Sequence, residues 1–134
     1  MAVQLSVAAR NARLDAIETT TGTAAVLQIR SGAQPADCAT ASSGDLLCSI
    51  TLPSDWMAAA SGGTKAKLGT WTGTAGAAGT AAHFRVFNSG ATVCHLQGSV
   101  TATGGGGDMT LDNAVLADGQ TVTVNTFTLT DANA

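Results

Sequence analysis

QTVTVNTFTLT, residues 120–130, decides the fold, because apolar residues alternate along it with polar ones. This period of two predicts a β-strand with one face turned toward a hydrophobic core. The alternation changes parity in the middle, since the apolar side chains are Val122 and Val124 and then Phe127 and Leu129. A β-bulge near residues 125–126 would return all four side chains to one face, and we predict a bulge there.

The same alternation continues through most of the chain. Further strands are expected at 25–30, 46–52, 64–71, 81–87, 92–102 and 108–115, separated by turns rich in Gly, Asn, Asp and Ser. The stretch TGTAGAAGT, residues 72–80, is expected to be a flexible loop. We therefore predict one all-β domain over residues 1–134, with a jelly-roll-like antiparallel β-sandwich over residues 24–131.

The beginning of the chain has a different period. In residues 4–18, QLSVAARNARLDAIE, small and apolar residues recur at helical spacing, at Leu5, Ala9, Ala12 and Ala16. This predicts an N-terminal helical segment over residues 1–19, which packs either on another protein or on its own domain. A second, short inserted helix is expected at WMAAAS, residues 56–61, because Pro53 favours a helix start and the Ser-Asp pair after it can cap one.

The charged fraction of the chain is low. Asp, Glu, Lys and Arg make up 11% of the 134 residues, against about 25% in a typical soluble domain. A surface of small, uncharged residues suits close packing against other protein chains, because charge normally keeps soluble proteins apart. We therefore interpret the chain as a structural protein that contacts other subunits.

Charge and hydropathy also exclude classes of partner. The net charge is −3 and the six basic residues form no run, so we predict no nucleic-acid partner. No apolar stretch approaches the roughly 18 residues of a membrane span, and the first residues do not have the pattern of a secretory signal. We predict no membrane partner and synthesis in the cytoplasm.

Two histidines are the first candidates for a reactive or metal-binding site. His83 and His95 would face each other across a hairpin that turns at Ser89. A metal needs further ligands, and the sequence offers no third one at a suitable place, so we predict no metal. Motifs for phosphate loops, dinucleotide binding and nucleophilic serines are missing from the sequence. The sequence thus predicts no cofactor, no catalytic residue and no enzyme.

The chain has three cysteines, Cys38, Cys48 and Cys94. An odd number at irregular spacing does not form a disulfide framework, so free thiols are expected. A bridge between Cys38 and Cys48 is the alternative, because these two residues flank a predicted loop.

Six segments together resemble a known family. They are RNARLDAIE, LQIRSGAQPADC, ITLPSDWMAAASGGTKAKLGTW, GTAAHFRVFNSG, GSVTATGGGGDMTLDN and GQTVTVNTFTLTDAN. In this order they resemble a family of small tailed-bacteriophage virion proteins, and the resemblance covers nearly the whole chain. The most specific pieces are IRSGAQP, LPSDWMAAASGG and GQTVTVNTFTLT, and none of them is a catalytic signature.

The resemblance implies a structural component of the virion, and jelly-roll-like capsid cement proteins are the nearest functional analogue. Such proteins bind the outer face of the capsid as dimers or trimers and brace it against internal DNA pressure. The implied partners are the major capsid protein and further copies of this chain. The alternative is a tail or tail-fibre component that acts as an adhesion module. Trp71 is expected in the core, and Trp56 either in the core or at an interface. The hypothesised partner-contact residues are Leu5, Val7, Arg10, Arg13, Ile17 and Trp56.

Overall fold

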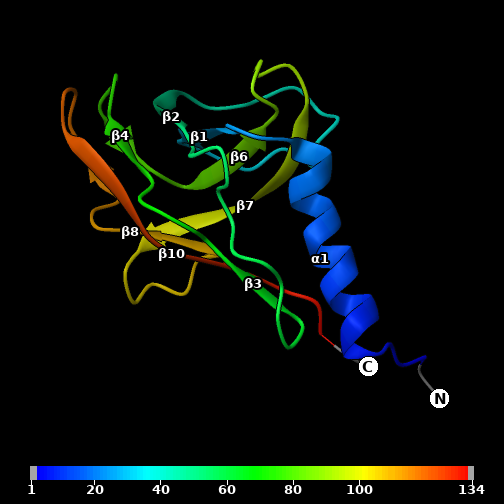
Figure 1. The fold of residues 1–134 in the computed structure, drawn as a ribbon. Coiled ribbons are helices and arrows are strands. Elements are labelled where there is room, and N and C mark those ends of the chain that lie inside the picture. Colours follow the sequence, from blue (N-terminus) through cyan, green and yellow to red (C-terminus); the bar gives the residue numbers. More distant parts are fainter. Residues whose placement is uncertain (1–2, 133–134) are drawn as a thin grey trace.

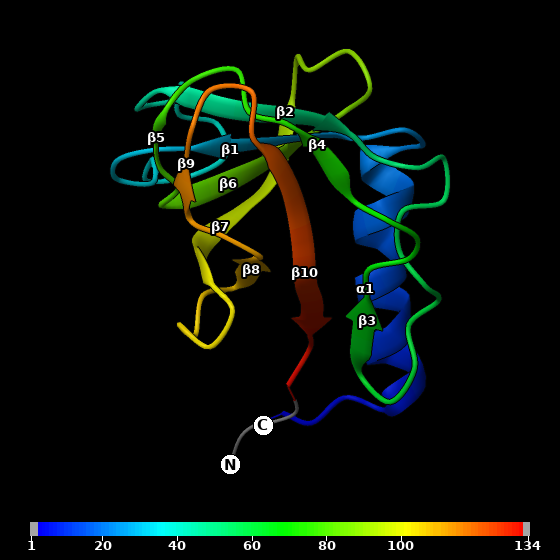
Figure 2. The same cartoon turned by 90° about the vertical axis from the view of Figure 1, so that its left-hand side faces the viewer.

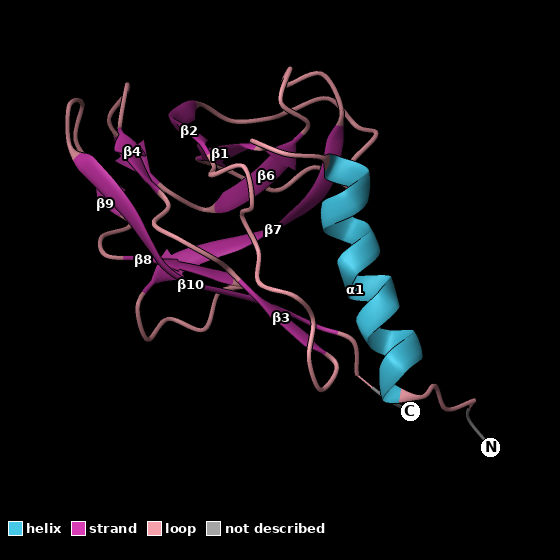
Figure 3. Ribbon diagram, in the orientation of Figure 1, coloured by secondary structure: helices cyan, strands magenta, loops and turns pink. Residues whose placement is uncertain are grey.

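The computed structural model describes residues 3–132, in which one α-helix lies beside a curled β-sheet (Figures 1 and 3). The helix is α1 (Val7–Thr21). The strands are β1 (Val26–Arg30), β2 (Leu46–Thr51), β3 (Thr64–Ala66), β4 (Thr72–Thr74), β5 (Gly79–Thr80), β6 (His83–Phe87), β7 (Cys94–Ala102), β8 (Met109–Leu111), β9 (Val115–Leu116) and β10 (Thr121–Thr130). The prediction of a mostly β-structure with an N-terminal helix is confirmed.

Helix α1 is shifted toward the C-terminus relative to the predicted range 4–18. It begins after Ser6, whose side-chain oxygen accepts a hydrogen bond from the Ala9 N–H at 3.1 Å, as an N-cap does. At the other end, the hydroxyls of Thr19 and Thr21 bond to main-chain carbonyls one turn earlier, so these threonines extend the helix. The helix then ends at Gly22, which has a positive φ of 92°. No helix in residues 3–132 combines the length and the apolar character needed to cross a membrane.

Eight strands form one sheet in the order β2-β1-β6-β7-β8-β10-β3, with β4 paired to the first part of β10. Strands β5 and β9 pair with each other in a separate small sheet (Figure 2). The predicted wholly antiparallel arrangement is wrong, because β7 and β8 run parallel. The glycine-rich connection between them turns the chain back within six residues, with Gly104 and Gly106 at positive φ values of 88° and 81°.

The predicted short helix at residues 56–61 is also wrong, because this segment is extended. Its main-chain N–H groups bind to neighbouring elements: Met57 donates to Glu18 at 3.3 Å and Ala60 donates to Asp15 at 2.9 Å, both on α1. Ala58 donates to the carbonyl of Ala66 on β3 at 2.9 Å. A helix would need these groups for its own bonds, so tertiary pairing overrides the local alanine propensity.

Three other strand boundaries differ from the prediction. The strand expected at 64–71 is limited to β3, the strand expected at 108–115 divides into β8 and β9, and the expected loop at 72–80 contains β4 and β5. Strand β4 pairs with β10, and Gly73 lets it pack closely on β2, where an added Cβ would lie 2.8 Å from the Ile50 side chain.

The predicted bulge in the last strand is confirmed. The register between β10 and β8 shifts between Val124 and Thr126. As a result Val122, Val124 and Phe127 are all buried, although their sequence parity differs.

A row of aromatic rings occupies the centre of the core. Trp56, Trp71, Phe127 and Phe84 follow one another with ring centroids 6.0, 5.6 and 5.3 Å apart. Both tryptophans are completely buried, which confirms the expected core position of Trp71. The row joins the 53–61 segment to β10 and β6, so these parts of the chain share one core.

Candidate partner-binding surface

Helix α1 is fastened to the sheet by a buried lysine. The side chain of Lys65 on β3 is only 2% exposed, and its Nζ lies 2.7 Å from Asp15 Oδ1 and 2.8 Å from Glu18 Oε2. It also donates to the carbonyl of Ala58 at 2.9 Å. A buried ammonium group needs opposite charge and hydrogen bonds around it, so both carboxylates of α1 belong to the structure of the domain.

The ionisation of this cluster follows from its contacts. Burial acts to lower the pKa of Lys65, but the hydrogen bonds to Asp15 and Glu18 outweigh it, so the pKa is raised. The hydrogen bond from Lys65, together with the Ala60 N–H, lowers the pKa of Asp15. A hydrogen bond shared with Glu18 raises the pKa of Asp55. The cluster therefore favours a charged Lys65 facing charged Asp15.

The first half of α1 is held by a second set of contacts. Arg10 donates to the main-chain carbonyl of Asp131 at 3.0 Å, and Arg13 forms an ion pair with the Asp131 carboxylate at 3.2 Å. Asn11 accepts a hydrogen bond from the Gly63 N–H at 2.9 Å. The sequence left open whether the helix packs on another protein or on its own domain. In the structure α1 packs on its own domain.

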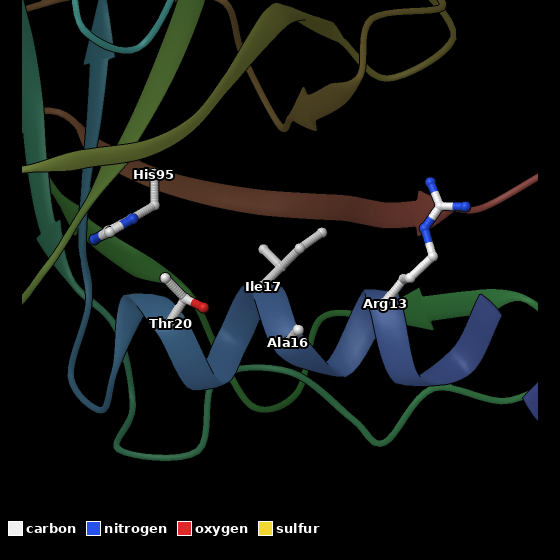
Figure 4. Close-up of a pocket in the computed structure, with 5 residues that line it drawn as sticks. All are labelled: Arg13, Ala16, Ile17, Thr20 and His95. Atoms are coloured by element: carbon white, nitrogen blue, oxygen red, sulfur yellow. The ribbon is translucent and has the colours of Figure 1, made fainter. Parts of the chain in front are cut away.

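A hollow runs along α1 between the helix and strands β7 and β10, and the Arg13–Asp131 ion pair borders it (Figure 4). One part, of about 230 Å³, is lined by Arg13, Ala16, Ile17, Thr20 and His95. Figure 4 shows Ile17 and Thr20 directed toward the strands and His95 directed toward the helix. A second part, of about 490 Å³, shares Arg13, Ala16 and Ile17 and continues to Thr130 and Asp131.

A third part of the hollow, of about 450 Å³, lies between β7 and β10. It shares Thr130 with the second part, and it is lined by residues of β6, β7 and β10, among them Phe84, Leu96, Phe127 and Leu129. We call the three parts together the open groove.

The helix also has a face of small residues beside the open groove. Ala8, Ala12 and Ala16 are exposed there, and Val7 at the start of the helix is 47% exposed. Of the stripe predicted from the sequence, Ala12 and Ala16 belong to this face, whereas Leu5 and Ala9 are half-buried. A flat face without long side chains loses little side-chain entropy when a partner covers it.

The structure brings together some of the hypothesised contact residues and separates others. Val7, Arg13 and Ile17 lie on or beside the exposed side of α1, and the Arg13 side chain is 63% exposed. Leu5 is half-buried just before the helix, and Arg10 is half-buried in its bond to Asp131. Trp56 is fully buried and donates from its indole N–H to the Gly22 carbonyl at 3.0 Å, so it is a core residue and not a contact residue.

The sequence did not point to the strand side of the open groove. That side is formed by His95 and Leu96 of β7 and by Leu129 and Thr130 of β10. The sequence carried no signal for it, because a strand was expected over residues 108–115 and only the structure shows that the three residues of β8 separate β7 from β10 in the sheet.

The two histidines do not face each other. His83 pairs with Ser99, and His95 falls at the register shift between Val86 and Phe87, so the hairpin does not turn about Ser89 as expected. His83 is buried, with Nδ1 3.0 Å from the Gly32 carbonyl oxygen. In the part of the chain that the structure describes, no three His, Cys, Asp or Glu side chains are grouped so that they could hold a metal ion.

All three cysteines are free, and the alternative Cys38–Cys48 bridge is not formed. Cys48 is buried on β2, whereas Cys38 lies in the β1–β2 loop next to Cys94. Burial, followed by a hydrogen bond with the Cys94 thiol, raises the pKa of Cys38 to about 11.

This raised pKa predicts slow alkylation of Cys38. At pH 8 its reaction with iodoacetamide is expected to be about 100-fold slower than that of a thiol with an ordinary pKa, since the thiolate is the reacting form. Peptide mass spectrometry of quenched samples measures the rate, with the urea-unfolded chain as control. Equal rates in the folded and unfolded chains would contradict the prediction.

Comparisons of the chain with known protein families, with curated proteins and with solved structures found no match. The function proposed for the chain therefore rests on its residues and their geometry.

Proposed function

We propose that this chain is a structural subunit of a tailed-bacteriophage virion, namely a capsid cement protein. In this proposal it binds the major capsid protein on the outer face of the shell and stabilises the shell through subunit contacts, with no catalytic role. The body is proposed to be a jelly-roll-like β-sandwich, which the curled sheet around a single aromatic core supports.

The observation that carries the proposal is the exposed small-residue face of α1, held rigidly by the buried Lys65 cluster. A cement protein must cover part of a preformed shell, and a rigid, uncharged helix face loses little freedom on doing so. The low charge of the whole chain agrees with a protein whose surface is covered in an assembly.

Arg13 supplies polar specificity beside this face. Its Nε pairs with Asp131, which leaves the terminal guanidinium nitrogens of a mostly exposed side chain for an acidic residue of the capsid. Ile17 lines the same hollow as Arg13, and Val7 is exposed at the start of the helix, so both can add apolar contact area.

A charge placed on the helix face tests the proposal. Ala12→Glu is expected to weaken binding to particles stripped of this protein at least tenfold, because it puts an unpaired carboxylate into a covered apolar contact. Glutamate is a good helix former, so α1 should remain folded. Co-sedimentation with purified particles measures the binding.

Ala117→Glu is the matched control, because Ala117 is also exposed but lies in a turn before β10, away from α1. It should bind like the unchanged chain. Wild-type binding by Ala12→Glu would show that this face does not meet the shell. Binding to isolated tails rather than capsids would replace the cement role with the tail alternative.

A further inference from the structure

Two of the three cysteines lie in contact, although they are far apart in the sequence. Cys38 lies in the β1–β2 loop and Cys94 begins β7, and the Cys38 thiol is hydrogen-bonded to the Cys94 thiol. The Cys94 thiol donates in turn to the Leu96 carbonyl at 3.4 Å. Both cysteines are half-buried, so a small reagent can reach them. Thiols are weak hydrogen-bond donors, and these bonds do not keep the two sulfurs from reacting.

The strand register places Cys94 beneath this loop. Phe87 pairs with Cys94 across β6 and β7, so the two side chains share one face of the sheet. Arg85 lies on the same face, with its guanidinium carbon 5.5 Å from the centre of the Phe87 ring. Arg85 also donates to the Cys38 carbonyl at 2.9 Å. The part of the loop that carries Cys38 therefore covers the face on which Cys94 lies.

Side chains hold the β1–β2 loop over these strands on both sides of Cys38. Residues 31–45 contain no helix or strand. Before Cys38, Gln97 on β7 donates to the Pro35 carbonyl at 2.8 Å, and after it, the buried Arg85 donates to Ser42 Oγ at 2.8 Å. The fold therefore fixes the main chain around Cys38 relative to β7, and the two sulfurs are kept together.

We propose that Cys38 and Cys94 form a reversible intramolecular disulfide when the folded chain meets a low-molecular-weight disulfide such as oxidised glutathione. The Cys94 thiolate attacks one sulfur of the oxidant, which forms a mixed disulfide and releases one glutathione thiolate. The Cys38 thiolate then attacks the Cys94 sulfur, which forms the protein disulfide and releases the second glutathione thiolate. The two cysteines lose two electrons and two protons, and the reduced glutathione molecules take up both.

The contacts of the two thiols set this order of attack. Burial, followed by the hydrogen bond with Cys94, raises the pKa of Cys38 to about 11, so Cys38 keeps its proton and reacts poorly with an external reagent. As the second nucleophile it needs no encounter, because the Cys94 sulfur is already beside it. Such proximity raises the rate of the second step.

The third cysteine is on the other side of the sheet. Cys48 is 2% exposed, and Ile29 pairs with Cys48 on one side and with Phe84 on the other, all three within the hydrophobic core. Phe84 and Arg85 are consecutive on β6, so their side chains point to opposite faces. The sheet therefore separates Cys48 from the Cys38–Cys94 pair.

Oxidation would fasten the β1–β2 loop covalently to β7. Because the bond closes the long loop from residue 38 to residue 94, it should raise the thermal midpoint by roughly 5–15 °C. Reducing compartments keep thiols free and oxidising ones allow disulfides, so the bond would form on transfer from the first to the second. The pair does not involve the exposed face of α1, so its failure would leave the proposed function unaffected.

Incubation of the folded full chain with oxidised glutathione tests the proposal. By mass spectrometry after acid quenching, we expect a monomer that has lost two hydrogen atoms, in which the peptides containing Cys38 and Cys94 are joined and Cys48 is a free thiol. Dithiothreitol should restore the original mass. In the urea-unfolded chain, which is the control, the preference for the Cys38–Cys94 pair should disappear.

Serine variants separate the roles of the three thiols. Cys48→Ser should form the bond at the same rate as the unchanged chain. Cys38→Ser should stop at a mixed disulfide with glutathione on Cys94, and Cys94→Ser should react with glutathione at least tenfold more slowly than Cys38→Ser does. Circular dichroism establishes that each variant remains folded.

Four results would overturn the proposal. They are a folded chain that keeps all of its thiols, a bond that includes Cys48, disulfide-linked dimers, and a thermal midpoint that falls on oxidation.

Discussion

Changing Asp15 to Asn and Glu18 to Gln together is expected to lower the free energy of unfolding and the urea midpoint. The reason is Lys65, which is 2% exposed and would keep its buried ammonium charge without either counter-charge. Urea unfolding followed by circular dichroism measures the change, with an unchanged slope as the sign that the transition stays cooperative.

A third substitution separates charge from packing in this experiment. Adding Lys65→Met to the double variant removes the buried charge but retains most of the apolar side chain, so much of the lost stability should return. If the triple variant is as unstable as the double, the loss comes from disturbed packing of α1 and the assigned role of Lys65 is wrong.

Trp71→Ala is expected to lower the free energy of unfolding by about 3–5 kcal/mol. Trp71 is completely buried and lies between Trp56 and Phe127 in the aromatic row, so its removal leaves a large cavity at the centre of the core. Thermal and urea unfolding of the purified variant both measure the loss.

Trp56→Phe provides a graded comparison. It keeps an aromatic ring but removes the indole N–H that bonds to the Gly22 carbonyl, so we expect a smaller loss of about 1–3 kcal/mol. An equal loss of unfolding free energy in Trp56→Phe and Trp71→Ala would contradict this prediction. It would mean that the hydrogen bond to the helix C-terminus stabilises the fold as much as the packing of the aromatic row does.

The sequence predicted local structure well where apolar residues recur with a single clear period. The parity change between Val124 and Phe127 correctly placed the bulge, because a buried face tolerates only one arrangement of those side chains. Trp71 was placed in the core because it was expected on a strand; it is buried, although it lies between β3 and β4. The helical pattern was predicted to end at Glu18, although bonds from the hydroxyls of Thr19 and Thr21 accompany its continuation to Thr21.

Tertiary pairing accounts for most of the differences. The alanines after Trp56 favour a helix locally, but their N–H groups bind Asp15 and β3 instead. A period of two shows which residues form strands but not which strands become neighbours, so the parallel pair β7–β8 could not be predicted.

The candidate surface was predicted only on its helix side. Val7, Arg13 and Ile17 were identified from helical spacing, whereas Trp56 was assigned to the contact set and lies in the core. The groove depends on how β7 and β10 diverge around the short β8, and this is a property of the assembled sheet. Lys65 was also missed, since nothing in its strand pattern shows that two carboxylates of α1 cover it.

An averaged image of the virion most directly tests the central claim, that this chain is a structural subunit of a phage particle. We expect density of its size on the outer face of the capsid, repeated at two-fold or three-fold positions, with α1 facing the shell. Density at the tail alone would replace the cement role with the tail alternative. Particles without any such density would contradict the proposed function.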